Sequence, residues 1–309
     1  MRIVFAGTPE FAAKHLKALL KSPYEILAVI TQPDKRGKRG RSLVESPVKK
    51  MARESGLKTL QPIKLTKKDL SPFHFELLVV VAFGQILDLD VLETPAKGSI
   101  NVHASLLPRW RGAAPIQRSI LAGDKNSGVT IMQMDDGLDT GNILASQSIR
   151  SAGENSDSLT KKLCSVGQEL LLKTLGEFDR LQKSAIPQND EHATYAPKIL
   201  KDEAKINWLS NSTFIERQVR AFYPSPVAYT FIDGIRVKIF SAEESTENNG
   251  NAGEILQVSK DGVLVGTKTK AIRIKEIQLN QGKGNILKGT DIQNGWSRIF
   301  SNGKFFEHT

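Results

Sequence analysis

Apolar and polar positions alternate along the first half of the chain as strands and helices do in an α/β protein. Short apolar runs predict β-strands over residues 2–6, 26–31, 77–83, 99–103, 128–133 and 143–149. Helical spacing of apolar residues predicts helices that begin near Pro9 and Pro47, and a long helix over 159–178. The 77–83 run is apolar on both faces, which is typical of a buried parallel sheet. We therefore expect a doubly wound, mostly parallel sheet of Rossmann-like type.

The pattern changes after about residue 183, where the regular apolar spacing ends. Residues 190–207 are polar and contain few apolar anchors, so we interpret them as a linker between two domains. The strand-like runs 227–232 and 235–240 flank Asp233-Gly234, which is a strong hairpin signal. One helix and three further short strands are predicted over 213–222, 254–258, 262–266 and 271–278. This pattern is typical of a small OB-like β-barrel over 208–309, after a first domain over 1–189.

Length and composition exclude several classes of protein. The chain has 309 residues, with 39% hydrophobic and 25% charged side chains, which suits a packed, folded protein. Its longest apolar run, residues 77–83, is far shorter than the roughly 20 residues that a membrane span needs. A single cysteine, Cys164, excludes a disulfide framework and a multi-cysteine zinc site. The N-terminus shows no secretory signal pattern, so we expect a cytoplasmic protein without a membrane segment.

The distribution of charge is compatible with an anionic partner. The net charge is +10, and residues 1–189 carry most of the excess, with 27 basic and 19 acidic side chains. The densest basic patch runs from Lys35 to Arg41, with five cations in seven residues. Such a patch attracts phosphates and releases counterions on binding. A charged, solvated surface loop explains the same residues, and charge alone slightly favours that simpler interpretation.

Two common types of ligand site find no support in the motifs. The first predicted strand runs into Ala6-Gly7-Thr8-Pro9. This turn has neither the G-x-G-x-x-G spacing of dinucleotide-binding proteins nor the Lys-Ser/Thr ending of a P-loop, so we do not expect NAD or ATP as ligands. The five histidines are scattered and none forms a pair with the spacing of metal ligands, so no metal is expected.

Polar side chains gather where two predicted strands end. Asn101 and His103 lie at the end of the 99–103 strand, and alternate positions of a strand point to the same side. Open α/β sheets bind ligands at the carboxyl ends of their strands. A turn-rich stretch over 134–141 follows the next predicted strand and contains Asp139. A single histidine is more often structural, and an acidic turn is commonplace, but the neighbouring amide favours a functional site.

Together, Asn101, His103 and Asp139 suit the direct transfer of an acyl-type group to an amine. The imidazole can take a proton from the attacking nitrogen or give one to the leaving nitrogen. The amide of Asn101 can donate a hydrogen bond to the oxyanion that develops on the transferred carbonyl. A carboxylate beside the imidazole stabilises its charged form and orients the ring. Such a transfer requires no nucleophilic serine or cysteine.

Several segments resemble the methionyl-tRNA formyltransferase family, and the resemblance covers essentially the whole chain. The segments that carry it are residues 1–9, 101–103, 105–112, 114–117, 137–141, 194–199 and 206–208. The resemblance implies a Rossmann-like formyltransferase fold, with 10-formyltetrahydrofolate as the formyl donor. It implies the α-amino group of methionyl-initiator tRNA as the acceptor, which gives N-formylmethionyl-tRNA for translation initiation. We expect a monomer that needs no metal.

The resemblance also implies roles for particular residues of the first domain. In the family, the residues that match Asn101, His103 and Asp139 form the catalytic trio. The strand and loop that match residues 79–85 hold the edge of the pterin ring through backbone contacts. The residues associated with the folate site match Ser105, Leu106, Leu107 and Pro108.

Under this resemblance, the basic patch belongs to a functional loop. The family's insertion that meets the acceptor end of tRNA matches residues 32–47, and the family's loop arginine matches Arg39. The second domain, over 208–309, is expected to contact tRNA as well. The loop cations to which we assign tRNA contact are Arg36, Lys38, Arg39 and Arg41.

Two other functions fit parts of the sequence. One is a related formyltransferase that acts on a small amine, such as glycinamide ribonucleotide or an amino-sugar nucleotide, but such a substrate requires neither the cationic loop nor a complete second domain. The other is an RNA-binding protein with an inert α/β domain, which would have no use for the trio. The chain departs from the family at Tyr223 and Ser225, where asparagine and tryptophan are usual, and at Asn142, where an acid is common.

Overall fold

The computed structural model describes residues 1–37, 42–247, 250–281 and 284–307. By their contacts, the residues form two compact units. The first unit consists of residues 1–115, 126–150 and 160–197, and the second of residues 116–125, 151–159 and 198–309. Because these units are defined by contacts alone, the independently folding domains expected from the sequence, 1–189 and 208–309, stay a prediction.

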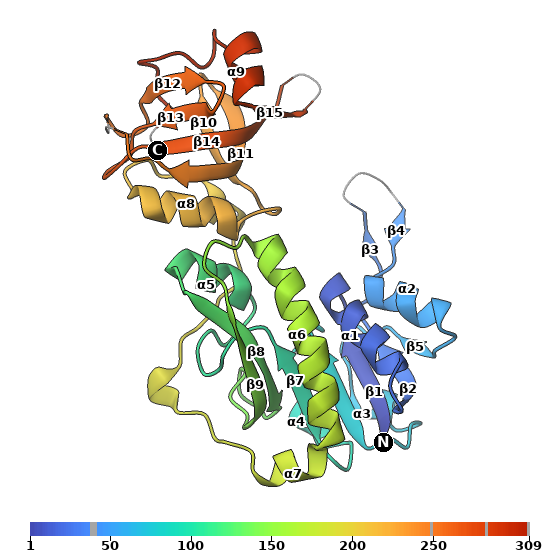
Figure 1. Ribbon diagram of the computed structural model, residues 1–309. Helices are drawn as coiled ribbons and strands as arrows, with labels where there is room; N and C mark the ends of the chain where they lie inside the picture. Colours follow the sequence, from blue (N-terminus) through green and yellow to red (C-terminus); the bar gives the residue numbers. More distant parts are fainter. Residues whose placement is uncertain (38–41, 248–249, 282–283, 308–309) are drawn as a thin grey trace. The chain divides into compact units, whose positions relative to one another are not determined.

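A seven-stranded sheet forms the centre of the first unit (Figure 1). Its strand order is β5-β2-β1-β6-β7-β8-β9. The strands are β1 (Arg2–Gly7), β2 (Glu25–Ile30), β5 (Thr59–Leu60), β6 (Leu77–Val81), β7 (Ser99–His103), β8 (Asn126–Gln133) and β9 (Ile143–Arg150). From β5 to β7 the neighbours pair in parallel, whereas β8 and β9 are antiparallel to their neighbours. The expected mostly parallel sheet is confirmed.

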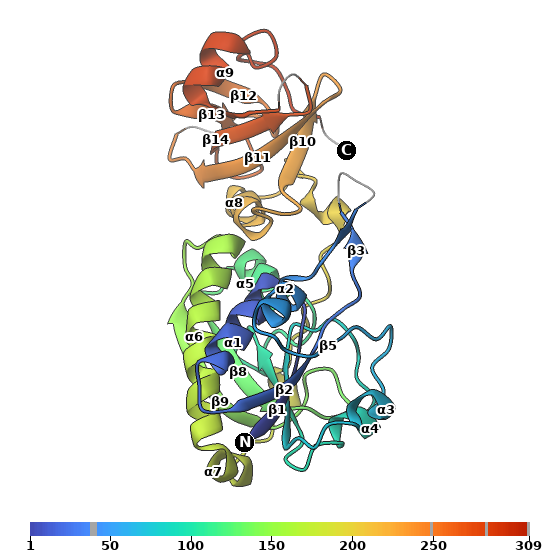
Figure 2. The same cartoon turned by 90° about the vertical axis from the view of Figure 1, so that its right-hand side faces the viewer.

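Helices cover both faces of this sheet (Figure 2). The helices α1 (Glu10–Leu20) and α6 (Ser156–Gly176) lie on one face, and α3 (Lys67–Leu70) and α4 (Leu89–Leu92) lie on the other. Alternate apolar residues of the strands make this possible, because each strand presents one set to either face. One set packs with the α3 and α4 side chains in a buried cluster that includes Val4, Ala6, Leu78, Val80, Leu70 and Val91. The doubly wound arrangement follows from strands that are apolar on both faces.

Further helices and strands lie in the N-terminal two-thirds of the chain. They are β3 (Lys35–Arg36), β4 (Leu43–Val44), α2 (Pro47–Glu54), α5 (Pro115–Ala122) and α7 (Phe178–Lys183). The expected start of α2 is confirmed, because the hydroxyl of Ser46 accepts the Lys49 N–H at 3.0 Å. The single helix expected over 159–178 was wrong in extent. It ends at Gly176, a poor helix former, and Phe178 begins a separate helix with its side chain buried.

The segment expected as a linker is held in place at its N-terminal end. The Arg111 N–H donates to the Thr194 carbonyl at 2.8 Å, and the Ala196 N–H donates to the Arg111 carbonyl at 2.7 Å. Short 3₁₀ turns cover Asp190–His192 and Lys201–Ala204. Backbone hydrogen bonds rather than a row of apolar side chains hold the segment, so its hydrophobic pattern could not indicate this order.

The second unit contains an antiparallel sheet with the order β10-β11-β14-β13-β12 and β15 paired to β14. The antiparallel strands and the hairpin at Asp233-Gly234 are confirmed. Neither β15 nor α9 was predicted from the sequence. The elements are α8 (Ser212–Ala221), β10 (Ala228–Ile232), β11 (Ile235–Glu244), β12 (Ile255–Ser259), β13 (Gly262–Val265), β14 (Ile272–Leu279), β15 (Ile286–Lys288) and α9 (Gly289–Gly295).

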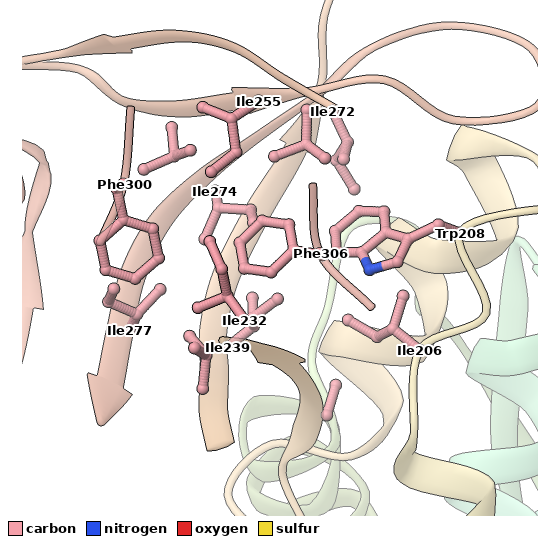
Figure 3. Packing of buried hydrophobic residues seen from close by; sticks show 14 of the residues in the cluster. Ile206, Trp208, Ile232, Ile239, Ile255, Ile272, Ile274, Ile277, Phe300 and Phe306 are labelled. Atoms are coloured by element: carbon pink, nitrogen blue, oxygen red, sulfur yellow. The ribbon is translucent and has the colours of Figure 1, made fainter. Parts of the chain in front are cut away.

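Trp208 belongs to the buried core of this unit (Figure 3). Its ring stacks on Phe306 with centroids 5.1 Å apart, and its Nε1–H donates to the Thr230 hydroxyl at 3.0 Å. The indole therefore buries a large apolar area without leaving its one polar atom unpaired.

Two findings bear on the classes of function considered above. Among the described residues, no helix is both long and apolar enough to span a membrane. Within the same parts of the chain, no three or more His, Cys, Asp or Glu side chains are grouped as ligands of a metal ion.

Candidate active site

Strand β7 places Asn101 and His103 on the same side of the sheet. These residues alternate with buried Ile100 and Val102, so the two polar side chains share one face. Ser99, two residues before Asn101, belongs to the same row of side chains along this face of β7. In the antiparallel pairing with β8, Asn101 lies opposite Met132 and His103 opposite Thr130. The chain therefore leaves β8 at the Ser99 end of β7, and the Met134 N–H donates to the Ser99 carbonyl at 2.9 Å.

The loop after β8 brings Asp139 back to this row. Its Oδ2 accepts the backbone N–H of Gly112 at 2.8 Å, and its Oδ1 accepts a hydrogen bond from Asn101 Nδ2 at 3.4 Å. The same Oδ2 lies 3.6 Å from Nδ1 of His103. Asp139 has a φ of +55°, in the left-handed region that non-glycine residues rarely adopt. The structure thus brings together the three residues that the sequence singled out.

The ring of His103 is buried, and both of its nitrogens face hydrogen-bond acceptors. Nε2 lies 2.9 Å from the carbonyl oxygen of Trp110, which can only accept, so Nε2 carries a hydrogen. Nδ1 faces the Asp139 carboxylate. With a hydrogen on Nε2, Nδ1 is the ring nitrogen that can take or return a proton, and it lies beside a carboxylate and an amide.

The four residues associated with folate by resemblance form a tight turn after β7. The hydroxyl of Ser105 donates to the Arg109 carbonyl at 2.7 Å, and the Leu107 N–H donates to the Thr130 hydroxyl at 3.1 Å. Ser105 is 1% exposed and Leu107 is 7% exposed. Leu106 packs against Gly128 of β8. These contacts support the loop that leads to Trp110 and Gly112, and Pro108 lies within the same turn.

Residues 79–85 form the end of β6, the strand next to β7, and the loop that follows it. Residues 79–81 are buried in β6, and the Phe83 carbonyl accepts the Thr8 hydroxyl at 2.8 Å. The side chain of Gln85 accepts the Leu65 N–H at 2.9 Å and donates to the Pro62 carbonyl at 2.9 Å. This loop therefore has a defined conformation at the carboxyl end of the parallel strands.

A cavity of about 380 Å³ adjoins the Asp139 loop at the Ser99 end of β7. It combines apolar side chains with polar groups of the backbone and of surface residues. Sequence reasoning missed it, although Ser99 lies two positions before Asn101 in the same row and was an available signal. The residues that line it are Leu89, Leu92, Glu93, Ala96, Lys97, Gly98, Ser99, Gln133, Met134, Asp135, Gly141, Asn142 and Gln182.

The basic loop is anchored at its base. Arg36 is exposed in β3, which pairs with β4. Asp34 accepts hydrogen bonds from Lys49 at 2.5 Å and from Gln61 at 2.8 Å. These hydrogen bonds lower the pKa of the Asp34 carboxyl from its ordinary value. The other three predicted loop cations, Lys38, Arg39 and Arg41, lie outside the described residues.

Comparisons with known proteins cover nearly the whole chain. The family model described as formyl transferase matches residues 1–175, and the model described as formyl transferase, C-terminal domain, matches residues 198–296. A methionyl-tRNA formyltransferase of Pseudomonas fluorescens (strain Pf0-1) is 46% identical over 308 residues, which are 98% of this chain and 96% of that protein. One of Pseudoalteromonas translucida (strain TAC 125) is 46% identical over 291 residues, with 92% of this chain and 90% of that protein covered.

Solved structures share the fold at low sequence identity. HypX from Aquifex aeolicus in complex with tetrahydrofolic acid matches with a TM-score of 0.67 and 17% identity, over 100% of this chain and 51% of that one. An N-formyltransferase from Helicobacter canadensis, in complex with folinic acid and dTDP-3-aminofucose, matches with a TM-score of 0.66 and 21% identity. That match covers 88% of this chain and 98% of the other. At these identities, the two structures support the fold alone.

Proposed function

The chain belongs to the methionyl-tRNA formyltransferase family, and we propose that Asn101, His103 and Asp139 carry out its reaction. The enzyme transfers a formyl group to the α-amino group of methionyl-initiator tRNA and uses a folate co-substrate. We propose 10-formyltetrahydrofolate as the donor. The observation that carries the assignment of residues is the convergence of three polar side chains, with Asp139 Oδ1 3.4 Å from Asn101 Nδ2 and Oδ2 3.6 Å from His103 Nδ1.

The trio can both move a proton and stabilise an oxyanion during the transfer. The methionyl amine forms a bond to the formyl carbon, the bond from that carbon to N10 breaks, and a negative charge develops on the formyl oxygen in between. The amide of Asn101 carries a second hydrogen that can donate to this oxygen. The His103 and Asp139 pair takes the proton that the amine loses and returns one to N10. The Trp110 carbonyl keeps the imidazole ring in orientation through Nε2.

We propose that Ser105, Leu106, Leu107 and Pro108 contact the folate, and that the cavity beside Ser99 accepts another part of it. Leu92 and Met134 provide an apolar lining, and the Asp139 loop forms one wall of the cavity. Along β7, Ser99 and Asn101 are separated by about 7 Å, two strand residues. A ring bound in this cavity would therefore place its substituent near the trio. The combination of apolar side chains with backbone polar groups suits a flat heteroaromatic ring.

We propose that the basic loop, with Arg36, Lys38, Arg39 and Arg41, contacts the acceptor end of the tRNA. The exposure of Arg36 and the anchoring of Asp34 at the base of the loop support this role. Residues 208–309 are proposed to contact tRNA as well. The proposed enzyme works as a monomer in the cytoplasm.

Transfer of a radiolabelled formyl group tests the proposed substrates. Charged initiator tRNA, glycinamide ribonucleotide and an amino-sugar nucleotide are each offered with 10-formyltetrahydrofolate. Only the charged tRNA should become labelled. Label on either small amine without label on tRNA would contradict the proposal, and so would equal rates with 5-formyltetrahydrofolate as the donor.

A further inference from the structure

A side chain outside the trio forms hydrogen bonds with the backbone of the loop that carries Asp139. Gln188, which is half-buried after α7, donates from Nε2 to the carbonyl oxygen of Asp139 at 2.9 Å and to that of Gly141 at 2.8 Å. An amide nitrogen has two hydrogens, so these two carbonyls use both of them. The side chain thereby fixes the backbone on each side of Thr140.

The orientation of this amide is set by a buried arginine. Nε of Arg111 donates to Oε1 of Gln188 at 3.1 Å, which directs the amide nitrogen toward the loop. Arg111 is 2% exposed, and its NH2 group donates to Asp190 at 2.8 Å. A buried guanidinium needs such partners, because an unpaired buried charge is costly. Arg111 also precedes Gly112, whose N–H binds the Asp139 carboxylate.

The loop needs external support because its backbone is tightly turned. Asp139 adopts a φ of +55°, a left-handed conformation that is unfavourable for a residue with a Cβ. Gly141 lies so close to the Gln133 carbonyl that an added Cβ would be 2.0 Å from its oxygen. Without the two hydrogen bonds from Gln188, the loop can relax and move the Asp139 carboxylate away from His103.

We propose that Gln188 is a positioning residue for the formyl transfer, with Arg111 as the residue that orients its amide. The inference rests on the proposed roles of His103 and Asp139. The hydrogen bonds of Gln188 to the loop go to two backbone carbonyls, so it acts through the backbone of the loop. Its loss should lower the rate of transfer at saturating substrates and weaken the interaction of Asp139 with the imidazole, while the tRNA is bound as before.

The test uses Gln188→Met and Gln188→Glu in the full-length enzyme. Met keeps the length of the side chain and removes the donors, whereas Glu keeps an acceptor for Arg111 and removes the amide hydrogens. Each variant should lower kcat about tenfold or more, because a displacement near 1 Å at a reacting group costs up to about 10²-fold. The KM for methionyl-tRNA should change less than twofold. Gln168→Met is the matched control, since Gln168 donates to a backbone carbonyl inside α6, at 2.9 Å, away from the trio.

A second measurement separates positioning from a loss of folding. The ring-proton resonances of His103 are recorded by NMR at one fixed pH and identified by their absence in His103→Ala. Because the Asp139 carboxylate moves relative to the ring, these chemical shifts should change in both Gln188 variants and stay unchanged in Gln168→Met. Thermal unfolding of each variant reports whether it is folded.

Three outcomes would overturn the inference. The first is wild-type kcat in a folded Gln188 variant, while His103→Ala is inactive. The second is a lowered kcat with unchanged His103 ring-proton shifts, which assigns the residue a general structural role. The third is unfolding of both Gln188 variants, which assigns it to the fold. Full activity of His103→Ala would instead contradict the proposed function and is thus distinguishable from all three.

Discussion

Nδ1 of His103 lies 3.6 Å from Oδ2 of Asp139, although the histidine comes from β7 and the aspartate from the loop after β8. The Gly112 N–H binds the same carboxylate oxygen at 2.8 Å. The carboxylate therefore has one fixed backbone donor and one side chain whose charge it can stabilise. This relationship ties the chemistry of the site to the exact position of a loop.

His103→Ala and Asn101→Ala should each lower kcat by about 10²-fold or more, because they remove a proton-transfer group or an oxyanion donor. Initial rates of formyl transfer to charged initiator tRNA measure the effect. Circular dichroism and thermal unfolding provide the control for folding. A folded variant with wild-type turnover would refute the assignment of that residue.

Gly141→Ala should lower kcat strongly and the free energy of unfolding only slightly. The added Cβ would lie 2.0 Å from the Gln133 carbonyl oxygen, so the backbone next to Asp139 has to move. We expect kcat to fall about tenfold or more. Gly176→Ala is the matched control, because a Cβ there meets no atom within 4 Å. Equal kinetics for the two variants would show that the loop tolerates the shift.

Ala96→Phe tests the cavity beside Ser99. Ala96 is exposed and lines this cavity, so a phenyl ring can fill the space without displacing the core. The KM for the folate donor should rise severalfold, whereas the KM for methionyl-tRNA should stay the same. Ala152→Phe, at an exposed turn, controls for an added surface aromatic. An unchanged folate KM in Ala96→Phe would place the folate elsewhere.

Arg39→Ala should impair the use of tRNA rather than of folate. Arg39 lies outside the described residues, and the prediction rests on the sequence and on the anchored base of the loop. The kcat/KM for tRNA should fall, and the slope of its logarithm against log salt should decrease by about one. Lys21→Ala, which removes an exposed cation at the end of α1, is the control. Equal defects in folate and tRNA kinetics would argue against a tRNA contact.

His15 should make the stability of the protein depend on pH. Burial lowers the pKa of His15 from 6.5 to about 4, while its Nδ1 donates to the Phe11 carbonyl at 2.7 Å. Between these two pH values the unfolded chain binds a proton at this residue that the folded chain does not bind. The stabilisation is thus fully present above pH 6.5 and is lost as the pH falls toward 4, by at most about 1.4 kcal/mol per pH unit.

Urea unfolding at a series of pH values between 7.5 and 4 measures this contribution. His15→Gln cannot titrate, so its free energy of unfolding should depend less steeply on pH across the same window. Equal slopes for the wild type and His15→Gln would show that the histidine keeps its ordinary titration in the folded state.

Local patterns predicted much of the fold because they depend on neighbouring residues alone. The apolar run that became β6 and the alternation that became β7 indicated a buried sheet, and Ser46-Pro47 indicated the start of α2. Short helices such as α3 and α4 were missed, since four residues give too few apolar repeats for a helical period. The order of the N-terminal end of the 190–207 segment was missed because backbone hydrogen bonds hold it.

By itself, the sequence determined the chemistry that the site could use. The spacing of Asn101 and His103 places them on one side of any strand, whatever surrounds it. Only the tertiary structure decided that Asp139 would meet them, because β8 runs antiparallel to β7 and its loop has to turn back toward the row. The support from Gln188 also depends on long-range contacts, since a side chain from after α7 reaches two carbonyls of that loop. No local sequence pattern can predict such contacts, because they depend on how distant segments pack.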